Sequence, residues 1–312
     1  MSSEFLYFDV TPSTPTLGAT INNVNLAEDN PKELFEELKE ALHKYKVIFF
    51  RDQDISDNKF LELGRHMGKL EIHEFFAKVK DHPEIQIIAT KGGDTGTNRW
   101  HSDVTFRPNP SAASIIRARD IPPEGGGDTL WMCCNAAYNG LSDPIKELLL
   151  KVEAIHDMRF GMTGYVNSEA VEKNARENPP RTHPAIIAHP ETGAPLLFVN
   201  SIWTSGFDKL TREESGMLLN FLYEHVKRPE FNVRFKWELN SIAIWDNLAT
   251  QHYALGDYEY DRVMNRMIVD GVAPAAFDPQ SATARLKSVL CKASKPFYGI
   301  NLTHKINGGR YV

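Results

Sequence analysis

The feature that most limits the fold of this chain is a long series of short apolar runs, each of five to eight residues, that starts near residue 85. Loops containing Gly and Pro separate the runs, as in DIPPEGGGD (120–128) and HPETGAP (189–195). The runs lie at 85–90, 99–106, 113–119, 128–132, 185–189, 195–201, 231–237, 241–246 and 265–272. Many short strands with turn residues between them predict a β-sandwich or a β-barrel.

Helical patterns precede and interrupt these strands. In NPKELFEELKEALHKY (30–45) the apolar residues fall on one stripe, and Pro31 suits a helix start. A second helix is expected after Ser56, a candidate N-cap, and two more at about 135–151 and 212–227. The last of these has Thr211 and Glu214 in capping-box spacing, and its predicted buried residues are Leu218, Phe221, Leu222 and His225 or Val226. The predicted fold is mostly β with α, the helices flanking a β core.

No repeat or long linker divides the sequence. We therefore expect a single domain over residues 1–312, with a core from about 15 to 273. The extension over 281–312 carries basic residues and no acidic one: Arg285, Lys287, Lys292, Lys295, Lys305 and Arg310. Two interpretations of it stay open, a solvated or docking tail and a contact with a partner chain.

Composition excludes several classes of protein. A net charge of -6 argues against a nucleic-acid binder, and no apolar run approaches a membrane span. The first residues, MSSEFLYFDVTPSTP, have no secretory pattern. Cys133, Cys134 and Cys291 form neither a CxxC motif nor a disulfide framework. These features predict a cytoplasmic protein with reduced thiols.

The stretch NRWHSDVTF (98–106) contains the first candidate metal ligands. In an extended strand, residues i and i+2 point to the same face, so His101 and Asp103 would project together and Ser102 away from them. A third ligand is available about 150 residues later, where IAIWDNLATQH (242–252) ends in His252. Two histidines and one carboxylate form the facial triad of non-haem Fe(II) oxygenases, and a zinc site is the chemical competitor.

An arginine for the co-substrate distinguishes these two kinds of metal site. The co-substrate 2-oxoglutarate has a distal carboxylate, which a guanidinium can bind through two hydrogen bonds. Arg262 follows His252 by ten residues, and Arg266 lies on the same face if both are in one strand. Thr129, in GGGDT (125–129), could supply a hydroxyl to the same carboxylate. Two cations beside one metal suit two anions, a co-substrate and a substrate.

Five motifs in order resemble the taurine dioxygenase family of Fe(II)/2-oxoglutarate-dependent oxygenases: WHSDVTF, GGDTLW, LFVN, IAIWDN…TQH and R-x-x-x-R. The resemblance spans about residues 15 to 273 and implies a double-stranded β-helix, or jelly roll. It implies that Fe(II) is held by His101, Asp103 and His252, and 2-oxoglutarate by Thr129 and Arg262. Dioxygen is the remaining co-substrate. Arg266 and His73 match the groups that bind the anionic head of the substrate.

The substrate shell departs from the taurine pattern. Phe76 stands where the taurine enzyme has a tyrosine, Thr97 where it has an asparagine, and HDMRFGM (156–162) differs from its serine-phenylalanine pair. Val104 belongs to the same expected shell. These changes remove the polar groups that bind the amine of taurine and keep the residues that bind its anionic head. The resemblance to alkylsulfatase members is equally close, so the expected substrate is a small anionic sulfonate or sulfate ester. Hydroxylation of the carbon beside sulfur or ester oxygen would give an aldehyde and sulfite or sulfate. The co-substrate would give succinate and CO2.

Three alternatives stay open at this point. The same oxygenase chemistry can act on a carboxylate-bearing substrate, such as a phenoxyalkanoate or a biosynthetic intermediate. A non-oxidative metal-dependent hydrolase would not need Arg262, and a silent jelly-roll binding module would tolerate loss of the triad. A homo-oligomer is expected only because the family often forms one.

Overall fold

The computed structural model describes residues 4–73, 76–92, 98–162 and 168–281. Within these residues, the largest sheet has eight strands. In sheet order they are β1 (Asp9–Pro12), β2 (Ala19–Asn22), β3 (Val47–Phe50), β14 (Ile242–Asp246), β6 (Ala113–Asp120), β16 (Arg262–Val269), β5 (His82–Thr90) and β4 (Ala77–Val79). Neighbouring strands are antiparallel except β2 and β3, which are parallel.

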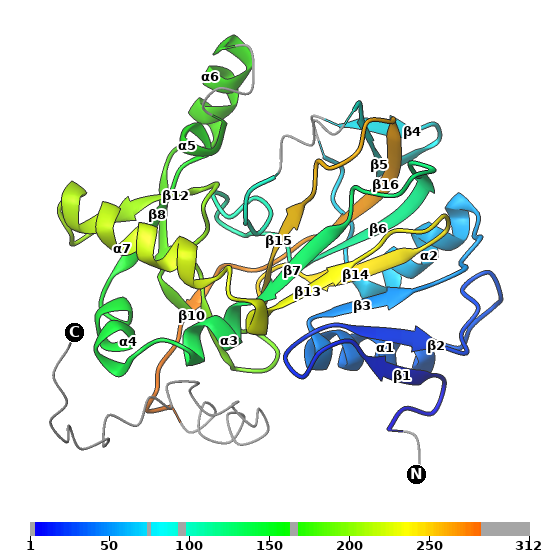
Figure 1. The fold of residues 1–312 in the computed structure, drawn as a ribbon, viewed down its shortest axis with the longest axis horizontal. Coiled ribbons are helices and arrows are strands. Elements are labelled where there is room, and N and C mark those ends of the chain that lie inside the picture. The colour runs from blue at the N-terminus through cyan, green and yellow to red at the C-terminus, as the bar shows by residue number, and fades with distance from the viewer. Residues whose placement is uncertain (1–3, 74–75, 93–97, 163–167, 282–312) are drawn as a thin grey trace, which may run out of the picture.

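A second, three-stranded sheet lies against the centre of the first and consists of β13 (Asn232–Phe235), β7 (Thr129–Cys133) and β15 (Thr250–Ala254) (Figure 1). One buried cluster joins the two sheets. Phe49, Trp245 and Met264 come from the large sheet, while Trp131 and Phe235 come from the small one. In β3, β14 and β13 every second residue enters the cluster, as the alternation of strand side chains requires. The expected strand-rich jelly-roll core is confirmed.

Two helices, α1 (Lys32–Tyr45) and α2 (Asp57–Met67), cover the other face of the large sheet (Figure 1). The stripe predicted for α1 is buried: Leu34, Phe35, Leu38, Ala41 and Leu42. Ser56 caps α2 as expected, since its side chain accepts a hydrogen bond from the backbone N–H of Lys59 at 3.2 Å.

A long insertion after β7 builds a separate cluster of apolar residues beside the two sheets. Its elements are α3 (Cys134–Asn139), α4 (Asp143–Leu149), β8 (Glu153–His156), α5 (Met158–Met162), α6 (Ser168–Glu177), β9 (Arg181–Pro184), β10 (Ile186–Ala188), β11 (Pro195–Leu197), β12 (Thr204–Phe207), α7 (Arg212–His225) and the 3-10 turn η1 (Pro229–Phe231). The short β17 (Ala275–Ala276) pairs with β10. In Figure 1, α5 and α6 project away from the sheets.

Two helix predictions need correction. The helix expected at 135–151 is two helices, α3 and α4, because Pro144 occupies the first turn of α4 and cannot continue a helix from α3. The capping box of Thr211 and Glu214 is present in α7. However, Phe221 of that helix is 44% exposed and not buried, whereas its neighbour Leu222 is 1% exposed.

The strand expected at 99–106 is also wrong. His101 makes an isolated bridge to His252, and residues 103–106 form a turn. Val104 has a φ of 49°, in the left-handed region, so the chain cannot run straight through this point. His101 and Asp103 therefore approach each other around a turn and not along one face of a strand.

Within the described residues, no helix is long and apolar enough to cross a membrane. The basic residues of the predicted extension, 285–310, lie outside the described part of the chain, as does Cys291. The division into a core over about 15–273 and an extension stays a prediction.

Candidate metal centre and its surroundings

The three predicted metal ligands lie together. Single ligand atoms of His101, Asp103 and His252 are all within 4.8 Å of one another, and all three residues are buried. Asp103 Oδ1 is 3.6 Å from His101 Nε2 and 3.8 Å from His252 Nε2. The backbones of the two histidines are paired as well, because each N–H donates to the other carbonyl, at 3.1 and 2.7 Å.

Neighbouring groups fix the orientation of two of these ligands. His101 Nδ1 is 2.8 Å from the backbone carbonyl of Arg99, so this nitrogen carries the proton and Nε2 keeps its lone pair. Asn247 holds the turn at Asp103: its Oδ1 accepts from the Asp103 N–H at 2.7 Å, and its Nδ2 donates to the Asp103 carbonyl at 3.0 Å. Ser114 Oγ donates to Asp103 Oδ2 at 3.2 Å.

The electrostatics of the cluster favour the protonation states that a cation needs. Burial raises the pKa of Asp103, but the charge of Arg266 and the interactions with His252 and His101 outweigh it and hold that pKa well below its ordinary value. Burial, with the neighbouring His101, lowers the pKa of His252 to about 3. Near neutral pH the site therefore contains a charged carboxylate and a neutral imidazole, which can bind a divalent metal without first losing a proton.

A buried guanidinium lies at the start of β16. Arg262 is 5% exposed, and its Nη1 donates to the carbonyl of Gly127. Among the described residues, its Nε has no hydrogen-bond partner. The ring of Tyr258 lies 5.3 Å from its Cζ. A buried cation with an unused N–H is suited to an anionic ligand.

Thr129 lies on the neighbouring small sheet. His252 pairs directly with Trp131, and Thr129 is two residues from Trp131 on β7, so Thr129 and His252 face the same side. The Thr129 hydroxyl accepts a hydrogen bond from Trp237 Nε1 at 3.0 Å, which leaves its own proton for another acceptor.

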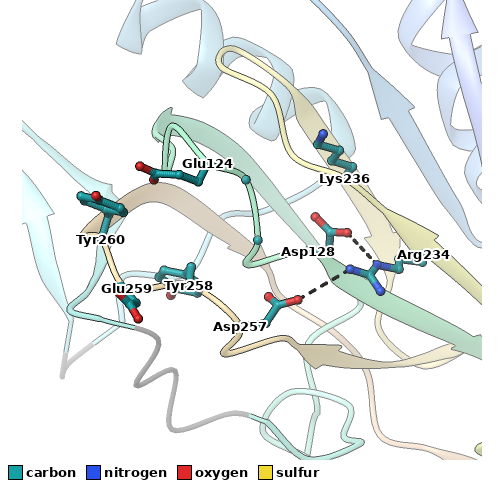
Figure 2. Close-up of a pocket in the computed structure, with 10 residues that line it drawn as sticks. Glu124, Asp128, Arg234, Lys236, Asp257, Tyr258, Glu259 and Tyr260 are labelled. Atoms are coloured by element: carbon teal, nitrogen blue, oxygen red, sulfur yellow. Dashed lines mark hydrogen bonds and ion pairs between the residues drawn. The ribbon is translucent and has the colours of Figure 1, made fainter.

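Tyr258, whose ring lies beside Arg262, also lines a cavity of about 540 Å³. The other residues that line this cavity include several charged groups (Figure 2). Asp257 Oδ1 accepts from the Gly127 N–H at 2.8 Å. Arg234 lies between two carboxylates, 2.6 Å from Asp128 Oδ2 and 3.7 Å from Asp257 Oδ2. Asp257 thus supports the loop whose carbonyl holds Arg262, a connection that sequence reasoning missed.

Arg266 reaches the candidate metal ligands from the same strand as Arg262. Its Nη1 is 3.4 Å from Asp103 Oδ2, and its Cζ is 4.8 Å from the centre of the Phe76 ring. The ring of His73 packs edge-on against Phe76 at 4.8 Å. Burial, together with the positive charge of Arg266, lowers the pKa of His73 to about 4, so its imidazole is neutral near pH 7.

The remaining predicted substrate residues are partly placed. Val104 is 9% exposed and belongs to a small apolar cluster with Phe106 and Met158, the latter from α5 and the HDMRFGM loop. Thr97 lies outside the described residues. Gln86 was missed: it is 0% exposed and its Oε1 accepts from Arg266 Nε at 3.1 Å and from Nη2 at 3.0 Å. The available signal was a single amide in the apolar run IQIIAT (85–90).

A jelly-roll core that carries two histidines and one carboxylate, with an arginine in contact with that carboxylate, defines the class of non-haem Fe(II) oxygenases. Comparison with known proteins gives the family. Residues 9–268 match the model of the Taurine catabolism dioxygenase TauD, TfdA family, and the chain belongs to this family. It is a member of the Fe(II)- and 2-oxoglutarate-dependent dioxygenases, and the hydrolase and binding-module alternatives are set aside.

Individual relatives are similar over most of their length. The chain is 34% identical to the Alpha-ketoglutarate-dependent sulfate ester dioxygenase of Pseudomonas putida, over 90% of this chain and 95% of that protein. It is 31% identical to the Alkylsulfatase of Acinetobacter baylyi, over 83% of each. A crystal structure of a putative alpha-ketoglutarate-dependent taurine dioxygenase from Burkholderia xenovorans superposes with a TM-score of 0.75 at 34% identity, covering 86% of this chain and 94% of that one.

Proposed function

We propose that this dioxygenase hydroxylates a small anionic organic substrate at the carbon next to the sulfur of a sulfonate or next to the ester oxygen of an alkyl sulfate. The hydroxylated product would break down to an aldehyde and sulfite or sulfate, while 2-oxoglutarate becomes succinate and CO2. The observation that carries the proposal is the position of Arg266, a half-buried cation 3.4 Å from the candidate metal ligand Asp103.

In this proposal His101, Asp103 and His252 hold Fe(II). The burial, mutual distances and N2O donor set of these residues fit that ion. When bound, the iron supplies the activation of dioxygen and of the substrate C–H bond. Arg262 and Thr129 hold the distal carboxylate of 2-oxoglutarate, and this assignment is supported by Arg262 Nε, which has no hydrogen-bond partner within the described part of the chain.

The protein itself orients the substrate. Arg266 binds the anionic head, and the neutral His73 donates one N–H to it. The apolar side chains of Phe76 and Val104 contact the carbon part of the substrate and exclude water from it. Holding the head beside Asp103 sets which carbon lies near the metal, and orientation of this kind is the main contribution that a protein makes to cofactor chemistry.

The printed activities of similar proteins favour sulfur-containing substrates. Besides the sulfate ester dioxygenase and the alkylsulfatase, the chain is 31% identical over 79% of its length to the Alpha-ketoglutarate-dependent sulfonate dioxygenase of Saccharomyces cerevisiae. A carboxylate-bearing substrate remains the alternative in the test. We also infer a reducing, cytoplasmic compartment, supported by the buried free thiols of Cys133 and Cys134. A homo-oligomer stays a prediction.

The test is anaerobic reconstitution with Fe(II) and 2-oxoglutarate, followed by oxygen and a panel of alkyl sulfates, sulfonates and carboxylates. We expect succinate formation that is coupled one-to-one to aldehyde and to sulfate or sulfite. Succinate formation that no compound stimulates would contradict the substrate assignment. Coupled hydroxylation of carboxylates alone would favour the alternative.

A further inference from the structure

Gln86 lies on β5 directly opposite Arg266 on β16. It is 0% exposed, and its Oε1 accepts from Arg266 Nε at 3.1 Å and from Nη2 at 3.0 Å. A guanidinium only donates hydrogen bonds, so the amide must present its oxygen to Arg266 and turn its NH2 group away from it. The orientation of the amide is therefore fixed by chemistry.

The amide NH2 of Gln86 is unsatisfied. No hydrogen-bond partner for Nε2 is present among the described residues, although the side chain is fully buried. A buried donor without a partner destabilises the folded state, and native proteins accept this mainly where a ligand or water completes the bond. Because Gln86 and Arg266 are directly opposite on β5 and β16, their side chains lie on the same face of the sheet, and a ligand held by Arg266 can complete this bond.

We propose that Gln86 is a specificity-determining part of the anion site: its carbonyl fixes Arg266 side-on, and its NH2 donates to the same substrate head. This inference rests on the proposed function and deepens it by naming the chemistry of the head. It also assigns a role to a residue that none of the sequence motifs contains.

Donor counting indicates the class of anion. Arg266 has five N–H groups, of which two are used on Gln86 and one on Asp103, so two remain for a ligand. A carboxylate has two oxygens, and these two N–H groups alone can satisfy it. A sulfate or sulfonate head has three terminal oxygens with lone pairs on every side, so it can use more donors than a carboxylate, and Gln86 adds one to those of Arg266 and His73.

The charge of the head follows from the same groups. Of the three residues proposed to bind the head, Arg266 is charged, and Gln86 and His73 are neutral near pH 7, while the charge of Asp103 is assigned to the metal. One cation with neutral donors matches a monoanion, as in an alkyl sulfate or sulfonate. An alkyl phosphate, with close to two negative charges at neutral pH, would leave one charge without compensation in a buried site.

The experiment compares wild type with Gln86→Met and Gln86→Glu. Calorimetry on the anaerobic Fe(II)–2-oxoglutarate holoenzyme measures the affinity for butyl sulfate, butanesulfonate, pentanoate and butyl phosphate. Met has a similar length and removes both amide roles. Glu keeps an acceptor for Arg266 but replaces the NH2 donor by a charged oxygen.

We expect Gln86→Met to lower the affinity for butyl sulfate and butanesulfonate about 10- to 100-fold, because one hydrogen bond to a charged group is lost. The affinity for pentanoate should fall clearly less. Gln86→Glu should lower the affinity for all the anions, and most of all for butyl sulfate. Wild type should prefer butyl sulfate to butyl phosphate. Gln53→Met is the matched control, because it removes a buried amide bonded to Leu26 and Arg51, and head-group preference should not change.

Equal affinity losses for sulfate and carboxylate in Gln86→Met, or no loss, would overturn the proposal. If Gln86→Met does not fold, the isosteric Gln86→Glu decides, since an unchanged affinity for butyl sulfate would exclude a donor role. Product analysis tests the proposed reaction, and binding tests the role of Gln86. Absence of aldehyde from wild type would contradict the reaction. Anion affinities that do not depend on Gln86 would contradict only its role in binding the head.

Discussion

Arg266 Nη1 lies 3.4 Å from Asp103 Oδ2, so the residue proposed to bind the substrate head contacts a proposed metal ligand. The two residues are 163 positions apart in the sequence and meet because β16 passes beside the turn that carries Asp103. A substrate held by Arg266 is therefore placed next to the metal by one contact. Loss of the arginine should affect substrate placement more than binding of 2-oxoglutarate.

Arg266→Gln should lower kcat/KM for anionic substrates roughly 100-fold, because a charged and partly bidentate contact is lost. The affinity for 2-oxoglutarate should change only slightly, because that anion is assigned to Arg262. Succinate release without aldehyde would therefore increase relative to the coupled reaction. Steady-state kinetics with separate assays for succinate and aldehyde measure both effects, and a coupled Arg266→Gln enzyme with normal kcat/KM would contradict the assignment.

Arg262→Gln should lower the affinity for 2-oxoglutarate about 100-fold or more, since the substitution removes a buried charge that binds a carboxylate. Affinity for Fe(II) alone should remain near that of wild type. Arg65→Gln is the matched control, because Arg65 is 63% exposed in its surface ion pair with Glu84. Titration of 2-oxoglutarate into the anaerobic Fe(II) protein measures the difference, and an unchanged affinity would remove Arg262 from the anchor.

Asp257 predicts a weaker, indirect effect on the same anchor. Its Oδ1 accepts from the Gly127 N–H, while the Gly127 carbonyl accepts from Arg262. Asp257→Ala should weaken 2-oxoglutarate about fivefold, the value of one ordinary hydrogen bond. Asp257→Asn retains an acceptor and should restore most of the affinity. If both variants behave alike, the charge contact with Arg234 matters and the support of Gly127 does not.

The candidate metal site could be predicted from sequence because its residue types are rare in combination. His101, Asp103, His252 and Arg262 were found by their chemistry and spacing, and the structure brings the first three together. The local reason was wrong, however: the chain turns at Val104 and does not continue as a strand. Asn247, 144 residues away, holds this turn, and a contact at that separation has no local signature.

The same reason explains the residues that were missed. Gln86 interacts with Arg266 across 180 positions, so its role appears only when β5 and β16 pair. The break between α3 and α4 differs, because Pro144 was visible in the sequence and predicts a helix start by itself. Phe221 shows the limit of helical periodicity: the stripe of α7 was assigned one residue too wide, and the packing of neighbouring elements sets its edge.

Asn247→Ala should reduce both stability and metal affinity. The variant removes the groups that satisfy the backbone N–H and carbonyl of Asp103 and the Ser111 carbonyl, all buried. We expect a loss of about 2–3 kcal/mol in unfolding free energy and roughly 10- to 100-fold in metal affinity. Asn232→Ala, which removes a side chain bonded to the Val226 carbonyl, should affect stability alone. Equal metal affinity in both variants would show that Asn247 does not position Asp103.

His156 predicts how stability of the protein depends on pH. It is 0% exposed, and burial, with the neighbouring His183, lowers its pKa from 6.5 to about 3. Since the unfolded chain takes up this proton more readily, the stability is fully present above pH 6.5 and is lost as pH falls toward 3.

At pH 5 this loss should be about 2 kcal/mol from His156, at about 1.4 kcal/mol for each unit below the unfolded pKa. Urea unfolding of the metal-free protein at pH 7.5 and pH 5 measures it. In His156→Gln the difference between the two pH values should shrink by about this amount, even if the variant is less stable at both. His82→Gln, at the partly exposed start of β5, is the control and should keep the wild-type difference. An unchanged pH dependence in His156→Gln would mean that this buried histidine is not a source of acid sensitivity.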